Sequence, residues 1–351
     1  MLKVFLLSIG VLLALLLVCA FSITRDGRQV TPSGEGTVKI GTKSFEAFEL
    51  PDYAASFLDG SYKSYFIEVE PGIKIHVLEI GEGYPVYAQH GNPTSGFLYR
   101  KVVSELPTDR VRVIMPTIIG LGFSSKVPAS QHTLANHKRW MSEALEQLGL
   151  TELVYVGQDW GGAIGVGALR ETPELLKGAV ILNTGFNAPT EKMSLSRAHD
   201  LAKTPVLGEL LLENLVSIFD RLHETQGDPA SIPEGVAELY GRPVIESGNK
   251  KAPLALMRMV PDGPDHPSSA ELRNIQSYVS SLDIPAEIVW GMQDPIFERA
   301  LPTMQSFFPE ARVTETRAGH FLQEEVPEEI AAAIMRIVER VDAGEAISPT
   351  P

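Results

Sequence analysis

The chain has 351 residues, of which 44% are hydrophobic and 21% are charged. These are the proportions of an ordinary globular protein with a sizeable core. The formal net charge of −14, without a long run of Lys or Arg, argues against a nucleic-acid partner, because a phosphate backbone attracts a basic patch. Cys19 is the single cysteine, so no intramolecular disulfide is possible. No zinc-ligand spacing occurs, and we expect neither a metal nor a cofactor.

The N-terminal stretch 4–24, VFLLSIGVLLALLLVCAFSIT, carries no charge. About 20 such residues, at ~1.5 Å rise each, would cross a bilayer of roughly 30 Å as a hydrophobic helix. Small residues around Cys19 also fit a cleaved signal peptide, and a lipid-modified Cys19 is a third option. Whether anchored or exported, we expect the catalytic part to lie outside the cytoplasm, and we expect residues 4–24 to associate with a membrane.

After a stretch rich in Gly, Ser and Thr, residues 25–60, which we expect to be a stalk or surface extension, eight runs predict strands. The first two alternate apolar and polar residues as an antiparallel hairpin does. The next four are short and apolar, as in a sheet covered on both faces, and two more runs supply the last strands. Helical patterns between them predict an α/β protein with a mostly parallel eight-stranded sheet. The predicted strands are 64–70, 73–80, 84–91, 111–116, 153–158, 178–183, 284–291 and 311–317.

The strand rhythm stops between Asn183 and about Pro264, where helical patterns such as 207–224 take over. We expect this insertion to be a helical lid over the carboxyl edge of the sheet, where open α/β sheets bind ligands. The expected organisation is a leader 1–24, a stalk 25–60, a core in two parts, a helical cap and a tail. The core parts are 61–184 and 265–342, the cap is 185–264 and the tail is 343–351.

Four stretches follow predicted strands: HGNPTSG at 90–96, GQDWGG at 157–162, GMQDPIF at 291–297 and AGHFLQEE at 318–325. In chain order the last three supply Asp159, Asp294 and His320. This is the order nucleophile, acid, histidine of the α/β-hydrolase triad, with an aspartate where G-x-S-x-G turns carry serine.

Each of these residues also has a plain structural interpretation. Asp159 would serve equally as a helix cap, and Asp294 as a turn residue before Pro295. Other histidines, among them His132 and His137, fit exposed loop positions. The combination of four motifs favours a nucleophile at Asp159, a general base at His320 and an orienting acid at Asp294.

Two further residues flank the expected nucleophile. Asn92 follows the third strand and offers a backbone N–H and a side-chain amide, while Trp160 offers a backbone N–H and an indole N–H. We expect the backbone groups to form an oxyanion hole and the side chains to hold an anion, although a tryptophan more often packs in a core.

These motifs resemble the haloalkane dehalogenases of the α/β-hydrolase superfamily, over about residues 61–340. The resemblance implies cofactor-free hydrolysis of small apolar haloalkanes to alcohol, halide and proton. Asp159 would form an alkyl ester while Asn92 and Trp160 stabilise the halide, and water activated by His320 and Asp294 would then cleave the ester. Some members carry the triad acid as glutamate after the sixth strand, where this chain has Asn183.

Two alternatives remain open at this point. An epoxide hydrolase shares the aspartate and histidine but generally needs two lid tyrosines to protonate the ring, and the lid contains only Tyr240. A non-catalytic protein that binds an apolar ligand would use the same scaffold without chemistry. The sequence leaves the oligomeric state unknown.

Overall fold

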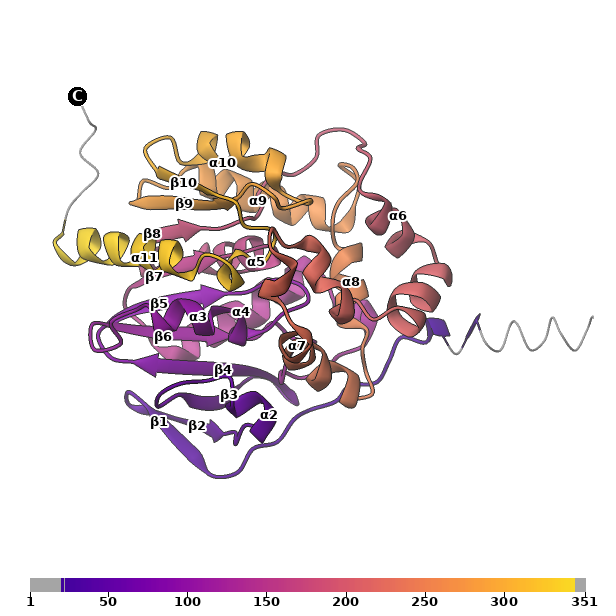
Figure 1. The fold of residues 1–351 in the computed structure, drawn as a ribbon, viewed down its shortest axis with the longest axis horizontal. Helices are drawn as coiled ribbons and strands as arrows, with labels where there is room; N and C mark the ends of the chain where they lie inside the picture. The colour runs from indigo at the N-terminus through magenta and orange to yellow at the C-terminus, as the bar shows by residue number, and fades with distance from the viewer. Residues whose placement is uncertain (1–19, 22, 345–351) are drawn as a thin grey trace, which may run out of the picture.

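The computed structural model describes residues 20–21 and 23–344 and is built around one ten-stranded sheet (Figure 1). The strand order is β1-β2-β3-β4-β6-β5-β7-β8-β9-β10. In this order the strands from β1 to β6 pair antiparallel with their neighbours. The strands from β6 to β10 pair parallel with their neighbours. The strands are β1 Thr37–Ile40, β2 Lys43–Ala47, β3 Lys63–Glu70, β4 Ile73–Gly81, β5 Tyr84–Gln89, β6 Val111–Pro116, β7 Leu153–Gly157, β8 Leu176–Ile181, β9 Ala286–Gly291 and β10 Arg312–Thr316.

The sheet has ten strands, whereas the sequence predicted eight. The two additional strands form the hairpin β1–β2, which lies in the stretch 25–60 that was predicted as a stalk. β2 pairs with β3 and so extends the antiparallel edge of the sheet. Ile40 and Phe45 are buried, and the Phe45 ring stacks on Tyr65 of β3 at 5.2 Å. The two strands span four and five residues and are mostly polar on one side. Strands this short leave too few alternations to stand out in sequence.

Helices cover both faces of the sheet (Figure 1). On one face α11 packs on β8 and β9 and against α3, and on the other α4 packs against α5 and β3, with α9 beside α5. The helices outside the lid are α2 Asp52–Ala55, α3 Arg100–Ser104, α4 Leu134–Leu148, α5 Trp160–Leu169, α9 Pro267–Ser280, α10 Leu301–Phe307 and α11 Pro327–Asp342.

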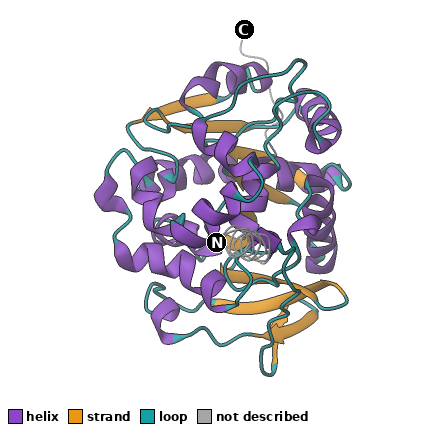
Figure 2. Ribbon diagram, turned by 90° about the vertical axis from the view of Figure 1, so that its right-hand side faces the viewer, coloured by secondary structure: helices purple, strands orange, loops and turns teal. Residues whose placement is uncertain are grey.

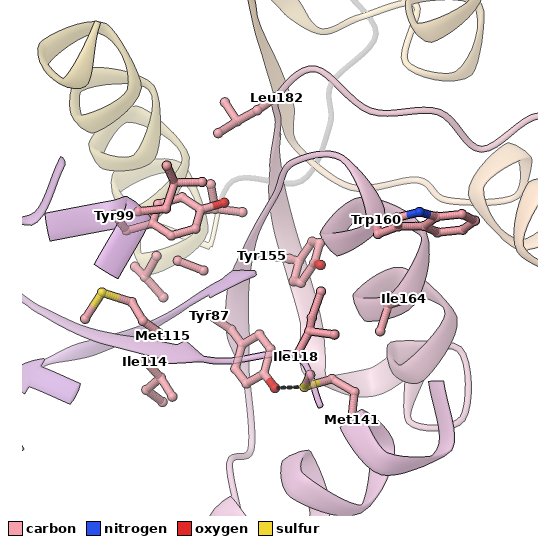
Figure 3. Close-up of a cluster of buried hydrophobic side chains, with 14 of the residues drawn as sticks. Tyr87, Tyr99, Ile114, Met115, Ile118, Met141, Tyr155, Trp160, Ile164 and Leu182 are labelled. Atoms are coloured by element: carbon pink, nitrogen blue, oxygen red, sulfur yellow. Dashed lines mark hydrogen bonds between the residues drawn. The ribbon is translucent and has the colours of Figure 1, made fainter. Parts of the chain in front are cut away.

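The core between the central strands and α4 and α5 is built from large side chains (Figure 3). Tyr87 of β5 and Tyr155 of β7 are fully buried, and the Tyr87 hydroxyl donates to the sulfur of Met141 on α4 at 2.7 Å. Tyr155 donates to the carbonyl of Gly161. These tyrosines therefore use their hydroxyl groups to tie strands to helices, since a buried hydroxyl needs a partner.

The chain between β8 and β9 is helical, and we call residues 185–264 within it the lid. Its elements are α6 Arg197–Lys203, the π-helix η4 Glu209–Leu215, the 3-10 helices η5 Phe219–Thr225 and η6 Pro229–Ser231, α7 Glu234–Glu246 and α8 Ala252–Arg258. The stretch predicted as one helix over 207–224 is broken into η4 and η5, because the backbone of Val216 is extended. Figure 2 shows the helical side of the molecule.

The leader predicted over residues 1–24 lies almost wholly outside the described residues, as does most of the expected tail. Among the helices of the described chain, none combines the length and the apolar character that a bilayer span requires.

His132 and His137 were expected at exposed positions, but both are buried. Their rings stack at 5.1 Å, with Nδ1 of His132 3.0 Å from Nε2 of His137. Burial lowers the pKa of His132 to about 4. The pair is therefore a neutral part of the packing around α4.

A buried ion pair fastens α3 to the loop that carries His320. Arg100 donates two hydrogen bonds to Glu324, at 2.6 and 2.9 Å, and Glu324 also accepts from the hydroxyl of Tyr240 on α7. The side chains of Arg100 and Glu324 are 7% and 0% exposed. Lys101 adds a contact to the same carboxylate. The helices α3 and α7 and the loop that carries His320 therefore meet at the carboxylate of Glu324.

Replacing Glu324 should destabilise the protein strongly. Glu324→Ala leaves Arg100 buried without its counter-ion, which typically costs about 3–5 kcal/mol. The matched control is Glu339→Ala, which removes the exposed pair with Arg110, at 55% exposure on both sides, and should cost less than about 1 kcal/mol. Urea unfolding of both variants measures the difference, and equal losses would contradict a structural role for the buried pair.

Candidate functional site

Asp159 lies on the turn between β7 and α5. Its φ of 50° and ψ of −132° lie outside the regions that a non-glycine residue usually occupies. The turn is held from both sides, since the backbone N–H of Asp159 donates to the carbonyl of Asn183, and the Thr184 hydroxyl donates to the carbonyl of Asp159. Such strain persists only where surrounding contacts fix it, and it is concentrated at functional sites.

Two glycines allow other chain segments to approach this turn. A Cβ on Gly161 would lie 2.3 Å from the carbonyl oxygen of Gln89 and 2.5 Å from that of His90. A Cβ on Gly91 would lie 2.3 Å from Cβ and Oδ1 of Asp159. The close approach of the turn to the loop after β5 therefore requires glycine at both positions.

The carboxylate of Asp159 has two different oxygens. Oδ1 accepts the backbone N–H of Asn92 at 2.7 Å, and Oδ2 lies 3.8 Å from Nε2 of His320. The side chain is 14% exposed. Burial raises the pKa of Asp159, against the opposing effects of His320 and of the backbone N–H groups of Trp160 and Asn92. One oxygen is thus fixed, and the other faces the imidazole without a direct hydrogen bond.

His320 is oriented by Asp294. Its Nδ1 lies 2.9 Å from Oδ2 of Asp294, so Nδ1 carries the proton and Nε2 is the acceptor on the side of Asp159. The Gln158 amide nitrogen lies 3.3 Å from Nε2 and donates to the His320 carbonyl. Burial would lower the pKa of His320, but the charge and hydrogen bond of Asp294, with Asp159 behind them, raise it above its usual value.

Asn183 binds and orients Asp294. In the sequence it stood out only because some members of the resembled family have a glutamate after this strand. Its amide donates to Oδ2 of Asp294 at 2.8 Å, and its oxygen accepts the Gly291 N–H. Burial would raise the pKa of Asp294, but the charge and hydrogen bond of His320, with those from Ile296 and Asn183, bring it below its usual range. Asn183 and Gln158 are the functional neighbours that sequence reasoning missed. Gln158 lies inside the motif at 157–162 and Asn183 ends a predicted strand, and these positions were the only signal.

The side-chain donors of Asn92 and Trp160 are engaged with the lid. The Asn92 amide donates to the Pro253 carbonyl at 3.1 Å, and the Trp160 indole N–H donates to the Leu256 carbonyl at 3.0 Å. Both acceptors belong to α8, which therefore lies directly over this part of the site. The sequence predicted that these two side chains hold an anion, whereas in the structure both donate to lid carbonyls. A sequence does not show which carbonyls the lid brings near.

The structure brings all five predicted residues together from four loops: Asn92, Asp159, Trp160, Asp294 and His320. His90, beside them, is structural, since Nε2 accepts the Ile118 N–H while Nδ1 donates to the Gly91 carbonyl. Within the described part of the chain, no group of three or more His, Cys, Asp or Glu side chains is arranged to hold a metal ion.

This geometry, a carboxylate on a strained strand-to-helix turn facing a carboxylate-oriented histidine, agrees with the comparisons with known proteins. The sequence profile of the alpha/beta hydrolase fold matches residues 84–327. The chain belongs to the α/β-hydrolase superfamily and, within it, to the haloalkane dehalogenase family. The resemblance seen in the sequence is thereby confirmed.

Three relatives show the extent of the similarity. The chain is 32% identical over 285 residues to the cis-3-alkyl-4-alkyloxetan-2-one decarboxylase of Shewanella oneidensis, covering 78% of this chain and 87% of the relative. It is 30% identical over 273 residues to haloalkane dehalogenase 2 of Mycobacterium tuberculosis, covering 75% and 90%. The haloalkane dehalogenase DatA of Agrobacterium tumefaciens superposes with a TM-score of 0.69 at 25% identity, covering 82% and 99%.

The pKa of His320 should depend on Asp294. In the intact protein we expect the imidazole to titrate above its ordinary value of about 6.5. In Asp294→Asn the counter-charge is lost while burial, which disfavours the cation, remains, so the pKa should fall. NMR of the His320 ring against pH measures both values. The same pKa in the two proteins would contradict the described pairing.

Proposed function

We propose that this protein hydrolyses small apolar haloalkanes to an alcohol, a halide ion and a proton. The observation that carries the proposal is the asymmetry of the Asp159 carboxylate. Oδ1 is bound by the Asn92 N–H, while Oδ2 lies on the side of the His320 imidazole. A carboxylate in this place suits attack on a saturated carbon, because such a carbon has no carbonyl for a serine alkoxide to add to.

In the first step Oδ2 of Asp159 attacks the carbon that carries the halogen. An electron pair of the carboxylate forms the new C–O bond, and the halogen leaves with the electrons of the C–X bond as halide. The product is an alkyl ester of Asp159. The attack needs an ionised carboxylate, which the N–H groups of Asn92 and Trp160 and the nearby His320 favour.

In the second step water adds to the ester carbonyl carbon of Asp159. Nε2 of His320 accepts the proton, and Asp294 stabilises the resulting imidazolium through the 2.9 Å contact. The negative charge develops on Oδ1, to which the backbone N–H of Asn92 already donates. Collapse of this intermediate breaks the bond to the alkoxide, which takes the proton from the His320 imidazolium and leaves as the alcohol. The carboxylic acid left at Asp159 then releases its proton, which restores the carboxylate.

Halide stabilisation by Trp160 requires its single indole N–H to turn away from α8, whereas the Asn92 amide has two N–H groups, one of which is bound to α8. The two side chains now donate to the carbonyls of Pro253 and Leu256, which are neutral acceptors. An anion is the stronger acceptor, so halide would compete for both donors as α8 moves outward. The proposal therefore includes a lid motion that accompanies the departure of the halide.

Epoxide hydrolysis is disfavoured by the surroundings of Tyr240. Its hydroxyl donates to Glu324 at 2.6 Å and accepts from Arg100, and its side chain is fully buried. Burial next to Glu324 raises its pKa well above the usual value. A tyrosine committed to this ion pair is not free to protonate an opening epoxide ring.

A second candidate follows from the relative named cis-3-alkyl-4-alkyloxetan-2-one decarboxylase, at 32% identity. A dialkyl oxetan-2-one would lose CO2 and leave an alkene, without release of halide. CO2 formation from such a lactone, with no halide from any haloalkane, would favour this reaction. A protein that binds both substrates and converts neither would support the non-catalytic alternative.

We further propose that residues 4–24 place the protein at a membrane, with the described part outside the cytoplasm. The support is the absence of charge over this stretch. Protease added to intact cells should then digest the described part of the chain. Full protection, with the chain recovered from the soluble cytoplasmic fraction, would contradict this location.

The direct test of the reaction is halide release from 1,2-dibromoethane and 1-bromobutane. The wild-type protein should release bromide over many turnovers, and Asp159→Asn should release none, because the amide is not a nucleophile toward carbon. Equal release by both proteins would remove Asp159 from the mechanism.

His320→Gln should separate the two steps. Without the base, the ester should form and persist, so bromide appears as a single burst of about one equivalent per protein. Intact-mass measurement should show the added alkyl group in this variant and not in Asp159→Asn. Continued turnover in His320→Gln would assign the general base to another group.

A further inference from the structure

Three large apolar side chains are exposed on the lid close to η4. Val206, Leu207 and Leu215 are 39%, 43% and 66% exposed, and we call them the apolar lid face. A single exposed leucine is ordinary, whereas several close together on one element suggest an interaction surface.

The described N-terminal end of the chain lies beside this face. The Ile23 carbonyl accepts from Nζ of Lys251 at 3.0 Å, and the same Nζ pairs with Glu213 of η4 at 2.8 Å. Glu213 is separated by one residue from Leu215. Phe21, 75% exposed, belongs to this end. Figure 1 shows the N-terminal end next to the lid helices, away from α11.

The backbone at Val206 adds a second, independent observation. Val206 has a φ of 66°, in the left-handed region that β-branched residues rarely adopt. Its carbonyl nevertheless accepts the N–H of Leu210, which holds it against the start of η4. Strain at an exposed apolar residue gives no benefit to packing, and backbone strain is concentrated at functional positions.

We infer that the apolar lid face and Phe21 rest on a lipid bilayer. The stretch 4–24 has the length and composition for a bilayer, and it ends where Lys251 binds the backbone at Ile23. No spacer separates this stretch from the lid, so a membrane that holds the stretch also meets the lid. Arg25 and Arg28, both exposed, follow directly and suit anionic headgroups.

This arrangement brings α8, which covers part of the site, close to the lipid phase. α8, whose carbonyls contact Asn92 and Trp160, follows Lys251 directly in the chain. Apolar substrates concentrate in bilayers, so they would reach the lid from the membrane. This consequence rests on the proposed dehalogenation, whereas the contact with lipid does not.

The contact is tested with the full chain bound to vesicles of phosphatidylcholine and phosphatidylglycerol with brominated acyl chains. Bromine quenches tryptophan fluorescence on contact, and the native Trp140, Trp160 and Trp290 are buried. The added tryptophan of Leu215→Trp should be quenched, while that of Ala332→Trp, exposed on α11, should not. Equal quenching of the two would overturn the inference. So would a blue-shifted Leu215→Trp spectrum without quenching, since the covering surface would then be protein.

A second experiment uses catalysis as the readout. The variant Leu207→Glu with Leu215→Glu should lose about ten-fold or more in turnover of 1-bromohexadecane dissolved in vesicles. Its turnover of 1,2-dibromoethane in water should stay unchanged. An unchanged ratio between the two substrates would contradict the inference. If neither substrate releases halide from the wild type, the proposed function fails, and the quenching experiment still decides the lipid contact.

Discussion

The structure depends on keeping one carboxylate ionised in a site that is almost closed to water. Removing a charged side chain from water costs several kcal/mol per ion unless hydrogen bonds and counter-charges replace the solvent. The Asn92 N–H, the Trp160 N–H and the His320 imidazole offset part of that cost at Asp159, where burial still raises the pKa, and each of the three comes from a different motif. The glycines at positions 91 and 161 are needed because these donors must come close to a strained turn. Asn183 joins both ends of the arrangement, through the Asp159 N–H and through Asp294.

Most of this site could be predicted from sequence, because its residues follow strands. The carboxyl ends of parallel strands meet at one edge of a sheet, so Asn92, Asp159, Asp294 and His320 had to lie close together once the strands were located. The hairpin β1–β2 could not be predicted in this way, since its short strands show too little alternation. The burial of His132 and His137 was also missed, because two neutral histidines that bond each other look in sequence like two surface residues.

The contacts between the lid and the site could not be predicted from the sequence. Asn92 and Trp160 were identified by their neighbours in the chain, but their acceptors in α8 lie far along the sequence. Which carbonyls they meet depends on how α8 packs, and no local pattern encodes that. The two contacts give the lid a chemical role as well as a steric one, because α8 and a leaving anion would compete for the same donors. Proteins on this fold differ in function through such sites rather than through the sheet.

The central claim is that Asp159 forms a covalent ester whose carbonyl carbon is then attacked by water. Turnover of 1-bromobutane in oxygen-18 water tests it most directly, with mass spectrometry of the peptide that contains Asp159. The account predicts that this peptide becomes heavier with turnover, because water supplies an oxygen to the regenerated carboxylate. A sample without substrate should stay unlabelled. An unlabelled Asp159 after many turnovers, with the label in the alcohol from the first turnover onward, would show direct attack by water and contradict the account.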